Sequence, residues 1–152
     1  MTPKSAQGRL HDLATRNQLA RLEAPNQEAA RQLHDDAMAH ARGVQAVLAV
    51  QDYSGTVLLA YEMSRKAALG LLLASGWRPS GGEGEHRITF EAAGYLLSAG
   101  PARTLNDAGY LRRQRNDNMY RQERADPGAA DEAAGLARRI AADVLPALKA
   151  LL

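Results

Sequence analysis

Residues 57–73 read VLLAYEMSRKAALGLLL and form the most apolar stretch of the chain. Alanine, leucine and methionine favour helix, and here the apolar side chains would cover most of the helix circumference rather than one stripe. A helix of this kind must be covered by other elements, because it leaves little polar surface for water. The stretch therefore predicts a central helix of a bundle, ending at Gly76.

The other helices are predicted from apolar residues at intervals of three and four and from flanking capping residues. They run from about Ser5 to Leu22, from Asn26 to the turn at 52–55, from Phe90 to Ser98 with Thr89 as N-cap, from about Ala102 or Thr104 to Glu123, and from about 130 to 152. The segment 77–85 is rich in proline and glycine and is predicted to be an exposed, flexible loop. The fold class is thus all-α, an up-and-down helical bundle.

Composition narrows the function classes. The 152 residues suffice for a substantial core without metal or disulfide support, and the absence of cysteine excludes disulfides and thiolate chemistry. No apolar signal segment follows the first residues and no apolar run is long enough for a bilayer, so we expect a cytoplasmic protein with no membrane partner. The net charge of +2 does not identify a nucleic-acid binder, so the distribution of charge matters more.

A basic run occupies residues 111–121, LRRQRNDNMYR. On a helix, Asn116 and Tyr120 lie one turn apart on nearly the same face, and Arg112 lies one turn before Asn116. Guanidinium groups bind phosphate, the amide can position an oxygen, and the phenol can donate a hydrogen bond or stack on a base. The run is a candidate phosphodiester site. The alternative is a solvated basic helix whose tyrosine packs against the bundle.

In order and spacing, the features of residues 52–152 resemble the HEPN superfamily. They are an Ala-Tyr-Glu-x-x-Arg-Lys-Ala-Ala helix at 60–68, a glycine-rich loop followed by 85–90, an Arg-Asn-x-x-x-Tyr step at 115–120, and a final amphipathic helix. The resemblance implies a HEPN-type bundle over residues 52–152, with residues 1–51 as an added N-terminal helical hairpin. It also implies a homodimer, since members of the superfamily commonly dimerise.

Many HEPN proteins are metal-independent RNA endonucleases of toxin–antitoxin or defence systems, with a motif of arginine, four to six residues, then histidine. By resemblance, Arg115 matches the arginine and Asn116 the polar residue after it, but Tyr120 stands in place of the histidine. A phenol has an unperturbed pKa near ~10 and needs activation to take a proton from a ribose hydroxyl. His86 is the candidate substitute base, brought to the site by the loop ahead of it.

The candidate catalytic residues are Arg115, Asn116, Tyr120 and Glu62, with Glu62 paired to Arg115. The candidate substrate-binding residues are Arg112, Arg113, Arg65, Lys66 and His86, and no metal or cofactor is predicted. The first functional hypothesis is that the chain is an RNA-binding or metal-independent RNA-cleaving toxin or defence protein. Its expected partners are RNA and an antitoxin or a nucleotidyltransferase-like protein. The alternative hypothesis is a non-catalytic helical dimerisation or protein-interaction module in which the Arg-Asn-x-x-x-Tyr residues are structural.

Overall fold

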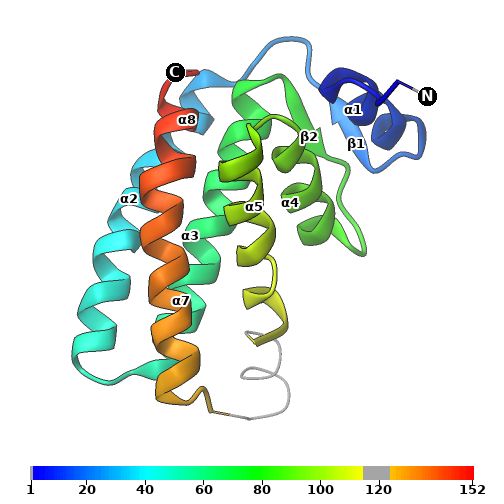
Figure 1. Cartoon of the computed structure of the whole chain (residues 1–152). Coiled ribbons are helices and arrows are strands. Elements are labelled where there is room, and N and C mark those ends of the chain that lie inside the picture. Colours follow the sequence, from blue (N-terminus) through cyan, green and yellow to red (C-terminus); the bar gives the residue numbers. More distant parts are fainter. Residues whose placement is uncertain (1, 115–123) are drawn as a thin grey trace.

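The computed structural model describes residues 2–114 and 124–152. These residues form a helical bundle with one short two-stranded sheet (Figure 1). The elements are α1 (Ala6–Thr15), β1 (Leu19–Arg21), α2 (Gln27–Ala49), α3 (Tyr53–Ala74), β2 (Trp77–Pro79), α4 (Glu85–Tyr95), α5 (Ala99–Ala108), α7 (Pro127–Arg139), the π-helical turn η1 (Ile140–Val144) and α8 (Leu145–Lys149). The predicted all-α fold class is confirmed.

Helix α3 is the centre of the bundle, as its apolar sequence predicts. It packs against α2, α4, α7 and α8. Tyr61 and Met63 are fully buried on it, and Asp52 caps its first turn by accepting a hydrogen bond from the backbone N–H of Gly55 at 2.9 Å. At Gly70 the missing side chain admits Leu148 of α8, because a Cβ there would lie 2.8 Å from a Leu148 methyl. Close packing around α3 therefore fixes the positions of its neighbours.

The first two helices take different places in the bundle. Helix α2 lies along α3, and its buried residues Ala30, Ala37 and Val44 belong to the same core. Helix α1 packs on α4 and on β1. The division of the chain at residue 51 into an N-terminal extension and a HEPN-like bundle stays a prediction. Within the described ranges, no helix is both long enough and apolar enough to cross a bilayer.

Two predictions near β1 and β2 were wrong. The first helix ends at Thr15 instead of Leu22, since the chain reverses at Asn17 with a φ of 59° and then pairs β1 with β2. The strands are antiparallel, and Arg21 lies opposite Trp77. The segment predicted as an exposed loop thus begins with a strand, and its Trp77 is only 1% exposed.

Two helix boundaries also differ from prediction. Helix α4 begins at Glu85, and Thr89 lies inside it, where its hydroxyl donates to the Glu85 carbonyl at 2.8 Å instead of capping the helix. The helix predicted over 102–123 is interrupted, because α5 ends at Ala108 and a turn at 109–110 precedes a new helical segment that begins at Leu111. This turn separates α5 from residues 111–114, which are the part of the basic run that the structure describes.

Candidate functional site

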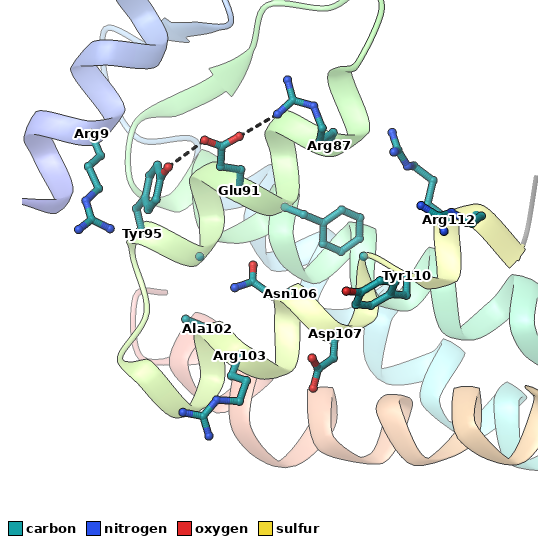
Figure 2. Close-up of a pocket in the computed structure, with 14 residues that line it drawn as sticks. Arg9, Arg87, Glu91, Tyr95, Ala102, Arg103, Asn106, Asp107, Tyr110 and Arg112 are labelled. Carbon is teal, nitrogen blue, oxygen red and sulfur yellow. Dashed lines mark hydrogen bonds and ion pairs between the residues drawn. The ribbon is translucent and has the colours of Figure 1, made fainter.

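A cleft of about 830 Å³ lies between α4 and α5. Helix α1 adds Arg9 to its lining, the turn after α5 adds Tyr110, and the helical segment that follows the turn adds Arg112 and Arg113 (Figure 2). Among the described residues, arginines outnumber carboxylates in this lining. The cleft therefore attracts anions more than cations.

The α4 wall of the cleft is a chain of paired side chains. Arg87 donates to Glu91 at 3.0 Å, and the hydroxyl of Tyr95 donates to the other oxygen of Glu91 at 2.8 Å. Burial, and then the hydrogen bond to Glu91, raise the pKa of the Tyr95 phenol, which keeps the donor protonated. Two donors thus satisfy the carboxylate of Glu91, so it opposes an incoming anion less than an unpaired carboxylate would.

Helix α5 and the segment after it bring three arginines to the cleft, and none of them has a partner among the described residues. The guanidinium groups of Arg103, Arg112 and Arg113 make no hydrogen bond and no ion pair with any residue in the described part of the chain. The nearby carboxylate of Asp107 is bonded instead to Arg139 at 3.0 Å. Beside these arginines, Tyr110 is 69% exposed. Unpaired guanidinium groups bind phosphate oxygens and an exposed phenol ring can stack on a base.

The structure places Arg112 and Arg113, two predicted substrate-binding residues, in this cleft. Arg112 also lines a hollow of about 230 Å³ together with His86, a third predicted residue. His86 lies in the first turn of α4, so it is not carried on a free loop. Its Nδ1 is 2.5 Å from the hydroxyl oxygen of Tyr61, which is fully buried on α3. The core therefore orients the imidazole, and Arg112 is its neighbour.

The predicted site residues of α3 lie apart from the cleft lining. Glu62 accepts a hydrogen bond from Arg65 at 3.0 Å. Lys66 is held by two side chains of α2, Asp36 at 3.3 Å and His40 at 3.0 Å. None of the three α3 residues is among the described residues that line the cleft. Their catalytic and substrate-binding roles stay predictions.

The core of the predicted motif, Arg115, Asn116 and Tyr120, lies outside the described residues, and so does the predicted pair of Glu62 with Arg115. Sequence reasoning missed several cleft residues that come from other elements: Arg9, Arg87, Tyr95, Arg103 and Tyr110. One signal was available, since Arg87, Glu91 and Tyr95 recur every four residues and so share a helix face. Among the residues described, no three His, Asp or Glu side chains gather closely enough to hold a metal ion.

His40 gives the contact between α2 and α3 a pH dependence. Burial, and then the charge of Lys66, lower the pKa of His40 from its ordinary value of 6.5, while Asp36 and Glu62 oppose the shift. The unfolded chain then binds this proton more readily than the folded one, so stability falls as the pH drops through the ordinary pKa. We expect His40→Gln to lose less stability than wild type between about pH 7.5 and about pH 5.5 in urea unfolding. Equal losses in the two proteins would contradict this assignment.

The structure is similar to the crystal structure of an archaeal HEPN homologue. The TM-score is 0.53, and the match has 22% sequence identity and covers 80% of this chain and 95% of that chain. No family model matches the sequence, and no curated protein matches it. The likeness shows that the chain has the HEPN fold, as the sequence motifs predicted.

Proposed function

We propose that this HEPN-fold protein binds RNA in the cleft between α4 and α5. The observation that carries the proposal is the gathering of Arg103, Arg112 and Arg113, whose guanidinium groups have no partner among the described residues, beside the exposed ring of Tyr110. Phosphates would bind the arginines, and a base would stack on the tyrosine. RNA offers both groups at regular intervals.

The shape of the cleft favours a polymer over a single small anion. Figure 2 shows Arg9 and Tyr95 toward one end of the cleft and Tyr110 and Arg112 toward the other. A lone phosphate would engage one of these cationic groups, whereas a strand of RNA would engage both ends at once. A charged cleft of this extent therefore suits an extended polyanion.

We extend the proposal to metal-independent cleavage of the bound strand. In this chemistry the ribose 2′-hydroxyl attacks the adjacent phosphorus, loses its proton to a base, and the bond to the 5′-oxygen breaks as that oxygen gains a proton. Arg115 would stabilise the charge on phosphorus, Asn116 would position the phosphate, and Tyr120 or His86 would exchange the protons. The support is that Arg115 is only two residues after Arg113 in the sequence, and that His86 shares a hollow with Arg112.

The same proposal includes the assembly. A homodimer would bring two copies of the motif to one shared site, as the resemblance to HEPN proteins implies. A toxin or defence role in the cytoplasm would add an antitoxin or a nucleotidyltransferase-like protein as partner. Light scattering at several concentrations checks the dimer, and co-purification with the product of a neighbouring gene checks the partner.

The cleavage experiment incubates purified protein with mixed-sequence RNA in EDTA. Wild type is expected to cut the RNA, and Arg115→Ala to slow the reaction at least about a hundredfold, because the loss of one group that stabilises transition-state charge has this cost. Tyr120→Phe, which removes only the hydroxyl, is the matched variant for proton transfer. Melting temperatures of all three proteins are measured alongside.

The outcomes separate the two functions. RNA left intact by wild type, together with a lower melting temperature or a dissociated dimer in Arg115→Ala, would support the non-catalytic interaction module. RNA bound but not cut would keep the binding proposal and remove the cleavage step. Cleavage that requires a divalent metal would contradict the proposed chemistry.

A further inference from the structure

We infer that the N-terminal helix α1 is part of the RNA-binding cleft and that Arg9 is one of its phosphate-binding residues. This rests on the proposed function of the cleft. Arg9 lines the cleft with residues of α4 and α5, although it is far from them in sequence. Its guanidinium carbon lies 5.3 Å from the centroid of the Tyr95 ring.

Helix α1 is a fixed wall and not a loose terminal arm. Leu10 and Leu13 are 0% and 1% exposed, and the helix contacts α4 and β1. The hydroxyl of Ser5 caps its first turn by accepting a hydrogen bond from the N–H of Gly8 at 3.1 Å. Because Arg9 directly precedes the buried Leu10, its backbone position is set by the core.

The side chain of Arg9 is oriented by a chain of contacts. The ring beneath it belongs to Tyr95, whose hydroxyl is bonded to Glu91 at 2.8 Å, and Glu91 is held in turn by Arg87 at 3.0 Å. A guanidinium group that stacks on a ring keeps its N–H donors in its own plane, where an anion can reach them. Arg9 is exposed, and within the described ranges no hydrogen bond or ion pair uses these donors. Its orientation is therefore set before a phosphate arrives.

The chain offers a matched control for Arg9 in the same N-terminal segment. Arg21 is also exposed, and its guanidinium carbon lies 5.1 Å from the centroid of the Trp77 ring. It carries the same charge in the same kind of contact, but it is not among the described residues that line the cleft. Any difference between variants at the two positions therefore reports on the cleft and not on net charge.

The experiment measures binding of a fluorescein-labelled oligouridylate of about 12 nucleotides to the full-length chain by anisotropy over a series of salt concentrations. Arg9→Gln is expected to weaken binding about tenfold at low salt, as for one charge-assisted contact. It should also reduce the slope of log K against log salt by about 0.7, the value for one phosphate contact on a single strand. Arg9→Lys should keep the wild-type slope, and Arg21→Gln should leave both affinity and slope unchanged.

Three results would decide the matter. If wild type does not bind the oligonucleotide, the proposed function itself is wrong. If wild type binds and Arg112→Gln weakens binding, but Arg9→Gln behaves like Arg21→Gln, the cleft binds RNA without α1 and this inference alone is overturned. If Arg9→Gln lowers both the affinity and the slope with an unchanged melting temperature, the inference stands. Glutamine keeps a long stem and good helix propensity, so the variant is suited to preserve α1.

Discussion

Replacing Arg103, Arg112 and Arg113 together by glutamine is expected to weaken RNA binding about a thousandfold. Each of these arginines lines the cleft, and none is paired with a described residue that would compete with a ligand for its guanidinium group. A charge-assisted contact with a phosphate is worth about 1.4 kcal/mol or more, which is about tenfold in affinity. Loss of three contacts should reduce the slope of log K against log salt by about 2.

A second triple variant separates the cleft from net charge. Arg31 and Arg42 on α2 and Arg138 on α7 are exposed, and none of them lines the cleft. Their replacement by glutamine removes the same charge, so a purely non-specific attraction to RNA would fall equally in both triple variants. We expect the control triple to lose less than about threefold, because distant charges are screened at physiological salt. Similar losses in the two variants would contradict a binding site between α4 and α5.

The central helix and the all-α class followed from local patterns, whereas the small sheet did not. The apolar run at 57–73 predicts a helix that is covered by other elements, and in the structure it forms the largely buried helix α3. Strands β1 and β2 have three residues each, and they pair although α2 and α3 separate them in the sequence. No periodicity can be read from three residues, and the prolines and glycines around Trp77 favour a loop locally. Only tertiary pairing makes this segment a strand.

The cleft likewise contains some residues that the sequence singled out and others that only the tertiary structure reveals. The density of arginine in residues 111–121 marked Arg112 and Arg113 from sequence alone, and the structure places both in the cleft. Arg9 and Arg103 are single arginines in ordinary amphipathic helices, so their local sequence gives no sign of a site. They enter the cleft because α1 packs on α4 and α4 packs on α5. Lys66 belongs to the motif at 60–68 and is bonded to Asp36 and His40 of α2, and its substrate-binding role stays a prediction.

The Trp77→Ala variant is expected to lose about 3–5 kcal/mol of stability, the usual effect of truncating a buried aromatic residue. Trp77 is 1% exposed, and two residues of the N-terminal segment contact its ring. The His11 ring packs edge-on at 5.6 Å, and the Arg21 guanidinium lies 5.1 Å from the Trp77 ring centroid. The variant leaves a cavity where β2 joins α1 and β1 to the bundle. Urea unfolding followed by circular dichroism measures the loss, since the variant has no other tryptophan for fluorescence.

Tyr110→Ala is the control for this variant, because Tyr110 is 69% exposed and its truncation should change stability by less than about 0.5 kcal/mol. Trp77→Phe, which keeps a ring in the cavity, should fall between the two. If α1 forms a wall of the RNA cleft, Trp77→Ala should also reproduce the reduced salt slope of Arg9→Gln under conditions where most of the protein stays folded. A stability loss below about 1 kcal/mol in Trp77→Ala would mean that the N-terminal segment is not held by this contact. The position of Arg9 in the cleft would then depend on the burial of Leu10 and Leu13 and on the contact of α1 with α4.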